Sequence, residues 1–270
     1  MTYEKIFNYL SALEKNNQQE WFQQTKDQRK TAVTEFYQLV DELSLALHEK
    51  DSEIQFIPAK KLSFKLNRDT RFSHDKTPYN PVFRAHIGPK GKLPIPVGYY
   101  IFLKPNNQSF LGGGLFADMF SEATEMIRQA IIEHEAEFLT IIQNPVFTEH
   151  FTVLGKQLKR MPRGYENYID SPIADYLKYK SMYLEYPLTD QEILDSDDFV
   201  SETVETFLLM KEFNQFLNNA LIDFAFPKRR QKNSKSSYFD DLLFFIFYSL
   251  LSIFVLLALL LAVYYSPLSE

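Results

Sequence analysis

Cysteine is absent from this chain of 270 residues. Its absence excludes disulfide bonds, thiolate nucleophiles, and zinc or iron–sulfur sites with cysteine ligands. The first twenty residues lack the apolar run and the small-residue cleavage site of a signal peptide. The chain also contains no Gly-x-Ser-x-Gly elbow and no His-Glu-x-x-His helix, so the sequence signatures of two common groups of hydrolases are missing.

Charge is unevenly distributed along the chain. The whole chain has a formal net charge of −6, from 29 Lys and Arg against 35 Asp and Glu. Five of these cations and three of these acids lie beyond residue 227, so residues 1–227 have a net charge of −8. A domain this acidic is a poor match for nucleic acid, whose affinity comes mainly from neutralised phosphates. A local basic patch is still compatible with this balance.

A run of 24 residues near the carboxyl end, from Leu242 to Tyr265, contains no charged side chain. As a helix it would be roughly 36 Å long, against about 30 Å for the hydrocarbon core of a bilayer. Buried helices of globular domains rarely extend this far without a charge. We therefore predict a transmembrane helix that ties the chain to the lipid bilayer.

The two flanks of this predicted span differ in charge. The basic segment KRRQKNSK, residues 228–235, precedes the span, whereas residues 266–270 contain no Lys or Arg. The positive-inside rule then places the amino-terminal side in the cytoplasm. The sequence thus predicts a soluble cytoplasmic domain at residues 1–227, a basic juxtamembrane linker at 228–241, and a short tail outside the cytoplasm.

Apolar residues recur at helical spacing in several parts of the first 227 residues. An amphipathic helix at the amino terminus is predicted by Ile6, Phe7, Leu10 and Leu13. The same spacing predicts helices at residues 27–49, 119–142 and 199–225. Asn16 and Asn17 mark a break after the first helix.

Alternation of apolar and polar residues predicts strands in the middle of the chain. The predicted strands are residues 61–66, 83–87, 98–104 and 109–111, with one more possible at 180–186. The alternation directs four side chains toward the core, namely Phe64, Leu66, Phe83 and Ile87. Helices followed by strands and then by helices favour an α+β fold with an antiparallel sheet of about four to five strands.

The densest group of candidate functional residues is NRDTRFSHDKTPYNP, residues 67–81. Arginines bind carboxylate or phosphate through two parallel hydrogen bonds, and a lysine adds a point charge. The candidate ligand-binding residues are Arg68, Asp69, Arg71, Asp75, Lys76, Tyr79 and Arg84. The alternative is that Arg68–Asp69 and Asp75–Lys76 ion pairs fasten a long connection between strands. The sequence leaves both interpretations open.

This stretch resembles the signature RxxRDxRFxxxKxPY of a mostly bacterial family of conserved hypothetical proteins, the domain-of-unknown-function family 2461. Seven positions match it: Arg68, Asp69, Arg71, Phe72, Lys76, Pro78 and Tyr79. Lys65 stands where the signature opens with Arg, which keeps the charge but loses the two-pronged geometry. The resemblance covers residues 4–225 and implies no activity, because the family has no established one. The predicted transmembrane span is an addition to the family pattern.

A second block, residues 158–182, is also similar to the family. It contains Asp170-Ser171-Pro172 where the family shows an acid-His-Pro pattern. This difference weakens any role for a histidine at that place. Elsewhere, His74 and His86 lie near the basic stretch and could act as general bases, although such histidines are more often satisfied or exposed.

Three functions are compatible with these observations. The first is binding of a small anionic ligand, phosphate- or carboxylate-bearing, at the membrane surface. The second is a metal-assisted enzyme acting on a phosphate-bearing substrate, with Asp69 or Asp75 as general base or Mg²⁺ ligand. The third is a scaffold in which the motif is purely structural. The sequence identifies no cofactor and leaves open whether any reaction is catalysed.

Overall fold

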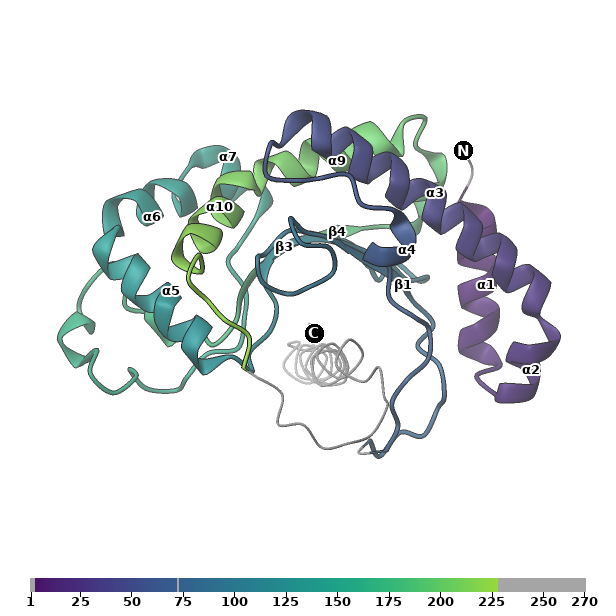
Figure 1. The fold of residues 1–270 in the computed structure, drawn as a ribbon, viewed down its shortest axis with the longest axis horizontal. Helices are drawn as coiled ribbons and strands as arrows, with labels where there is room; N and C mark the ends of the chain where they lie inside the picture. Colours follow the sequence, from purple (N-terminus) through teal and green to yellow (C-terminus); the bar gives the residue numbers. More distant parts are fainter. Residues whose placement is uncertain (1–2, 72, 228–270) are drawn as a thin grey trace, which may run out of the picture.

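The computed structural model describes residues 3–71 and 73–227 (Figure 1). These residues form an α+β fold with one four-stranded antiparallel sheet, as predicted. Helices come before, between and after the strands along the chain. The predicted transmembrane span at 242–265, its linker and its tail lie outside the described residues. Within those two ranges, none of the helices combines the length and the apolar character that a bilayer crossing needs.

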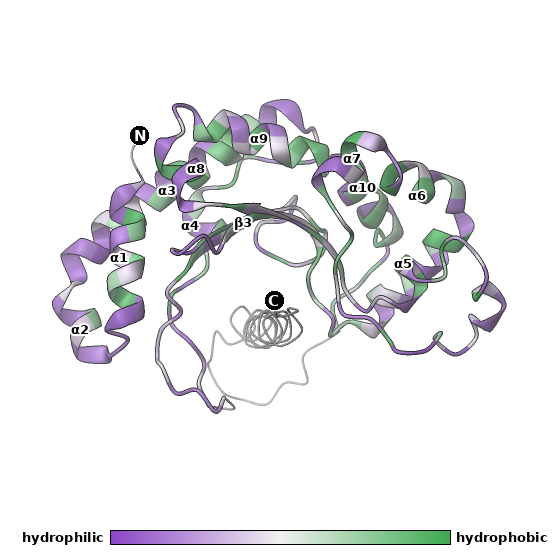
Figure 2. Cartoon of the chain, turned by 180° about the vertical axis from the view of Figure 1, so that it is seen from behind, coloured by the Kyte–Doolittle hydropathy of each residue, from purple (hydrophilic) through white to green (hydrophobic). Residues whose placement is uncertain are grey.

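The amino-terminal helices follow the predicted pattern closely. Helix α1 (Glu4–Lys15) buries its apolar stripe, including Ile6 and Leu10, and Figure 2 shows its hydrophobic and hydrophilic sides. After the break at Asn16, a short α2 (Gln19–Gln24) leads into α3 (Lys26–Lys50). The bounds of α3 agree with the prediction to within one residue at each end, because the apolar spacing continues through the whole helix.

The sheet is a meander of β1 (Phe83–Ile87), β2 (Tyr99–Leu103), β3 (Ser109–Leu115) and β4 (Met182–Leu188), in that order. All three neighbouring pairs are antiparallel. The strands predicted at residues 98–104 and 109–111 are confirmed, and they pair as a hairpin of β2 and β3. Its turn places Asn106 and Asn107 at φ of 68° and 56°, a left-handed region that asparagine tolerates.

The strand predicted at residues 61–66 is wrong. Its first residues belong to α4 (Ala59–Leu62), which starts after Pro58 and whose Ala59 N–H donates to Asp41 Oδ1 at 2.7 Å. The segment touches the sheet through a bridge between Ser63 and Ala85. Apolar alternation there reflects burial on two sides of a loop rather than a strand. The possible strand at 180–186 is confirmed as β4, whose bounds lie two residues further toward the carboxyl end.

The two long helices predicted in the second half are each divided. The stretch 119–142 contains α5 (Ser121–Glu133) and α6 (Glu135–Ile142), which break at His134. The stretch 199–225 contains α9 (Phe199–Leu209) and α10 (Lys211–Ala220), which break at Met210. In both cases the apolar spacing continues across the break, so periodicity alone does not reveal it. The remaining elements are α7 (Pro145–His150), α8 (Asp190–Asp195) and two 3₁₀ turns, Glu166–Tyr168 and Tyr176–Lys178.

The two faces of the sheet belong to different clusters of buried residues. Helices α3, α9 and α10 cover one face, here called the helix face, whose residues Phe83, Ile101 and Leu184 join the main core (Figure 1). The opposite face, here called the aromatic face, contributes to a second cluster: Phe64, Val82, Tyr100, Phe102, Phe110, Phe116 and Tyr183. Of the four side chains predicted to face the core, Leu66, Phe83 and Ile87 join the main core, whereas Phe64 joins the second cluster.

Candidate functional site

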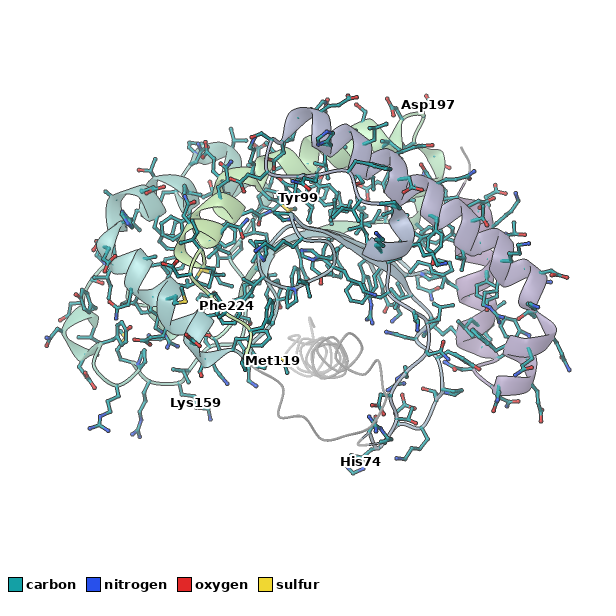
Figure 3. All side chains as sticks on the ribbon, viewed as in Figure 1. His74, Tyr99, Met119, Lys159, Asp197 and Phe224 are labelled. Carbon is teal, nitrogen blue, oxygen red and sulfur yellow. The ribbon has the colours of Figure 1, made fainter. Side chains whose placement is uncertain are left out.

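The signature residues form an arm, residues 67–80, that leaves the sheet next to β1. A bridge between Asn67 and Tyr79 closes its base, and the Arg68 N–H donates to the Pro78 carbonyl at 2.9 Å. His74 lies at the far end of the arm, away from the sheet (Figure 3). The described part of the arm is therefore a narrow extension held together by backbone pairing at its base.

Tyr79 anchors the arm to the amino-terminal helices. Its backbone N–H donates to Asn17 Oδ1 at 3.0 Å, and Asn17 Nδ2 donates back to its carbonyl at 2.8 Å. Its buried ring stacks on Phe22 with 3.7 Å between ring centroids. Tyr79 thus has a structural role in these contacts, and Asn17, which marked a break in the sequence, is its partner.

The arginines of the arm pair with its carboxylates, but not with the neighbours that the sequence suggested. Arg71 meets Asp69 through two parallel hydrogen bonds, Nε to Oδ1 at 2.9 Å and Nη2 to Oδ2 at 2.5 Å. Arg68 pairs with Asp75 and also donates to a threonine hydroxyl. Lys76 Nζ donates to the carbonyl of Thr70 at 2.9 Å rather than pairing with Asp75.

These pairs lower the pKa values of both carboxyl groups. The Arg71 guanidinium lowers the pKa of Asp69 through its hydrogen bonds. The Arg68 guanidinium, assisted by the backbone N–H of Thr77, lowers the pKa of Asp75 to about 2. Both carboxyl groups are ionised at neutral pH and accept hydrogen bonds from their arginines. They are consequently poor proton acceptors.

Arg84 is separate from the arm. It lies on β1 with a buried side chain that points to the aromatic face, and its guanidinium carbon is 5.1 Å from the centroid of the Phe64 ring. The seven candidate residues are thus divided into an ion-paired arm, the anchor Tyr79, and Arg84 on the sheet.

The strand register brings further polar residues into one row on the aromatic face. His86 pairs with Tyr100, Tyr100 with Gly112, and Gly112 with Glu185. His86 stacks on Tyr100 with 4.6 Å between ring centroids. Neighbouring strands are about 4.8 Å apart, so two spacings, roughly 10 Å, separate the backbones of Tyr100 and Glu185.

Gly112 leaves room in the middle of this row for an aromatic ring. A Cβ atom at Gly112 would lie 2.8 Å from the end of the Phe116 ring. Phe116 in turn contacts Tyr100 and Tyr183, at centroid distances of 4.7 and 4.4 Å. Gly112 therefore lies within β3 and lets an aromatic side chain cross the sheet face.

Burial shifts the pKa values of three groups on this face. It raises the pKa of Glu185 to about 7, and Glu185 Oε1 has no hydrogen-bond partner among the described residues. It lowers the pKa of His86 to about 3, against an opposing effect of backbone groups at Lys92 and Leu93. It raises the pKa of Tyr100, against the opposing positive charge of Arg84. Perturbed groups that gather in one place are typical of functional sites.

Sequence reasoning missed Tyr100, Tyr183 and Glu185 and gave His86 little weight. A signal was present: in β1 and β4, charged or ring-bearing residues alternate with the apolar residues of the core. Such a pattern indicates a strand with two different faces. The four residues come together only through pairing between strands that lie far apart in the chain.

The second block is fastened to α5. Arg128, a buried residue of that helix, donates through Nε to the Leu177 carbonyl at 2.7 Å and through Nη2 to the Tyr179 carbonyl at 3.1 Å. The hydroxyl of Tyr165 donates to Glu125 on the same helix. These contacts assign a structural role to much of this block. Within the described part of the chain, no group of three His, Asp or Glu side chains could hold a metal ion.

Comparison with known proteins adds one finding. A family model described as "conserved hypothetical protein (DUF2461)" matches residues 5–216. The matched range includes the arm, the sheet and the second block. Neither the curated proteins nor the solved structures contain a significant match to the chain.

Proposed function

This chain belongs to the DUF2461 family of conserved hypothetical proteins, and we propose that it is a membrane-anchored protein whose cytoplasmic domain binds an anionic ligand. The ligand carries a phosphate or carboxylate group. Arg84 on the aromatic face is its main contact, and the exposed Arg71 of the arm is a second, separate anion contact. Residues 242–265 anchor the domain in the bilayer.

The position of Arg84 is the observation that carries the anion site. Its guanidinium lies over the Phe64 ring, and its charge acts on the buried Tyr100 hydroxyl. A guanidinium can stack on an aromatic ring while its N–H groups donate in a fork to a carboxylate or phosphate. Low polarity around a charge strengthens such contacts relative to water. An acidic domain with a buried cation on an aromatic surface fits a ligand with a negative group and an apolar part.

The arm supports this function through its pairing. Arg68 and Arg71 are oriented by Asp75 and Asp69, and with Lys76 the arm has one more positive than negative charge. Holding an arginine in place reduces the entropy that is lost when it contacts a ligand. We expect a ligand anion to compete with Asp69 for Arg71, whose side chain is 56% exposed.

An enzyme is the second candidate, and one observation favours it. Asp69 and Asp75 are weak general bases because their arginines lower their pKa values, although an ionised carboxylate can still bind Mg²⁺. Glu185 is better suited, because a carboxyl group with a pKa of about 7 can both accept and release a proton at neutral pH. In this alternative, Glu185 carries out acid–base chemistry on a ligand that is held by Arg84 and extends across three strand spacings, roughly 14 Å, from β1 to β4.

The anion site is tested by thermal unfolding of the full chain in detergent. Inorganic phosphate and nucleoside phosphates should raise the melting temperature of the wild type. Arg84→Met should abolish this rise, and Arg84→Lys should restore part of it, because lysine keeps the charge without the fork. The matched control is Lys30→Met, at an exposed cation on α3. An undiminished rise in Arg84→Met would overturn the site.

A chelator separates the binding function from the metal-assisted one. A binding domain should keep its ligand-dependent rise in melting temperature when EDTA is added. A metal-assisted enzyme should lose turnover of a phosphate-bearing substrate under the same conditions.

The membrane part of the proposal rests on sequence and has its own test. Cells that express the chain are fractionated, and protease is added to intact spheroplasts. We expect the chain in the membrane fraction and its amino-terminal domain uncut. Recovery in the soluble fraction, or digestion of the domain from outside, would contradict the anchor or its orientation.

A further inference from the structure

We infer that the domain has a second, lipid-facing surface made by residues 155–164 and by Met119, and that its partner is a bilayer containing anionic lipids. We call it the basic loop surface. The inference rests on the proposed membrane anchor, but it concerns a different part of the molecule from Arg84 and the arm.

Three segments meet at this surface. Lys156 Nζ lies 3.1 Å from Asp118 Oδ2, which joins the loop to the segment before α5. In that segment, the Phe120 ring contacts Phe224 and Phe226 at centroid distances of 5.5 and 5.6 Å. Figure 3 shows Met119, Phe224 and Lys159 on the same side of the molecule. The end of the described chain, next to residue 228, is therefore close to the loop.

The charge of the loop is unusual for this domain. Residues 155–164 contain four cations and no acid, although residues 1–227 have a net charge of −8. Lys159, Arg160 and Arg163 are exposed, and within the described ranges no ion pair involves them. Clustered Lys and Arg beside a membrane anchor are attracted by anionic headgroups.

An exposed apolar side chain accompanies these cations. Met119 is 45% exposed and follows Asp118, the partner of Lys156. Basic residues next to exposed apolar ones are typical of surfaces that lie at a bilayer interface, where the apolar groups enter the headgroup region. Nucleic acid would use the cations but would leave Met119 in water.

The position of the predicted anchor selects the bilayer as the partner. The linker at 228–241 begins with Lys228, Arg229 and Arg230, so the positive charge continues from the surface toward the span. Fourteen extended residues reach at most about 50 Å, and a flexible chain of that length averages roughly 20 Å. A domain tethered this closely meets the membrane with the side from which its chain leaves.

The lack of cysteine allows a direct test with the full chain in liposomes. Met119→Cys and Lys159→Cys each receive one environment-sensitive fluorophore, and Leu45→Cys, exposed on α3, serves as the reference position. Spin-labelled headgroups then report how close each label is to the bilayer. In membranes with phosphatidylserine, we expect strong quenching at positions 119 and 159 and weak quenching at position 45.

Charge reversal shows whether the loop causes this contact. The triple change of Lys159, Arg160 and Arg163 to Glu should reduce quenching at position 119 to the level seen at position 45, while the chain still floats with the liposomes. The control is the change of Lys26 and Lys30 on α3 to Glu, which should leave the quenching at position 119 unchanged.

The possible failures are distinguishable. A chain that does not float with liposomes contradicts the anchor, and with it the proposed function. A chain that floats but shows equal quenching at all three positions overturns the basic loop surface alone. The same quenching in membranes of phosphatidylcholine only would overturn the role of the loop's charge.

Discussion

The two faces of the sheet use the same four strands for different purposes. On the helix face, side chains such as Ala85, Ile101 and Leu184 are apolar and at most 1% exposed. On the aromatic face, the neighbouring positions in the same strands include Arg84, His86 and Glu185. Burying an ionisable group costs free energy unless it is well paired. A face that served stability alone would not need these groups, so the contrast supports the site proposed on the aromatic face.

The faces bury different polar groups, although unpaired atoms occur on both sides, since Thr203 Oγ1 and Asn214 Oδ1 on the covering helices also have no partner among the described residues. On the helix face, the Tyr99 hydroxyl donates to Asp51 Oδ2 at 2.6 Å, and Asp51 Oδ1 lies 3.4 Å from Lys211 Nζ. On the aromatic face, Glu185 Oε1 and both ring nitrogens of His86 have no hydrogen-bond partner of normal geometry among the described residues. Unsatisfied buried groups in a native fold call for a functional explanation.

The largest expected effect tests the helix face as the main source of stability. Phe83 is 3% exposed and packs on Phe36 with 5.2 Å between ring centroids. Phe83→Ala should lower the free energy of unfolding by about 3–5 kcal/mol, because a cavity replaces the ring. Urea unfolding followed by the fluorescence of Trp21 measures this loss.

Phe64→Ala provides the counterpart on the aromatic face. We expect a smaller loss than for Phe83→Ala, since Phe64 belongs to a cluster of seven residues and its ring lies under the cation of Arg84. An equal or larger loss would show that the aromatic face contributes as much to stability as the helix face.

Much of the helix face was predictable, and most of the aromatic face was not. Local alternation sufficed for β1 and for the hairpin of β2 and β3, because each of these signals lies within a short stretch of sequence. The pairing of Arg68 with Asp75 depends on how the arm folds between Asn67 and Tyr79. The environment of Glu185 depends on pairing with Gly112, which is far away in the chain. Periodicity contains no information on such distant neighbours.

Glu185 makes the free energy of unfolding depend on pH. Its pKa in the folded state, about 7, is above the usual value of 4.5, so the folded state holds the proton more tightly. The stabilisation is complete below pH 4.5 and is lost as the pH rises through 7. The loss amounts to at most about 3 kcal/mol.

Glu185→Gln should remove this pH dependence. The variant should match the wild type near pH 4.5 and exceed its free energy of unfolding at pH 8, measured by urea unfolding across that range. Glu212→Gln, at an exposed position on α10, is the control. A wild-type stability that does not decline between pH 5 and 8 would contradict the burial of Glu185.

A smaller loss of stability is expected when the paired carboxylate of Asp51, next to the helix face, is replaced. Asp51→Asn removes the charge that accepts the Tyr99 hydrogen bond and pairs with Lys211, and should cost about 1–3 kcal/mol. Tyr99→Phe should cost less, because the hydroxyl leaves together with its need for a partner. Urea unfolding of both variants and of the double variant gives the coupling energy, and additive losses would mean that the bond contributes nothing.

The smallest effect on stability, and the sharpest test of function, is expected on the arm. Arg71 is more than half exposed, and ion pairs of this kind contribute at most about 1 kcal/mol. Arg71→Ala should therefore leave the melting temperature of the empty domain nearly unchanged while it lowers the stabilisation by phosphate-bearing compounds. Arg71→Lys should rescue this response poorly, because the two-pronged geometry is lost. Asp69→Asn is the matched control: it breaks the same pair but keeps the guanidinium, so the response to phosphate should persist. If Arg71→Ala unfolds the empty domain, or if Asp69→Asn lowers the response as strongly, the pair is a structural fastening, and the aromatic face must bind any anion without the arm.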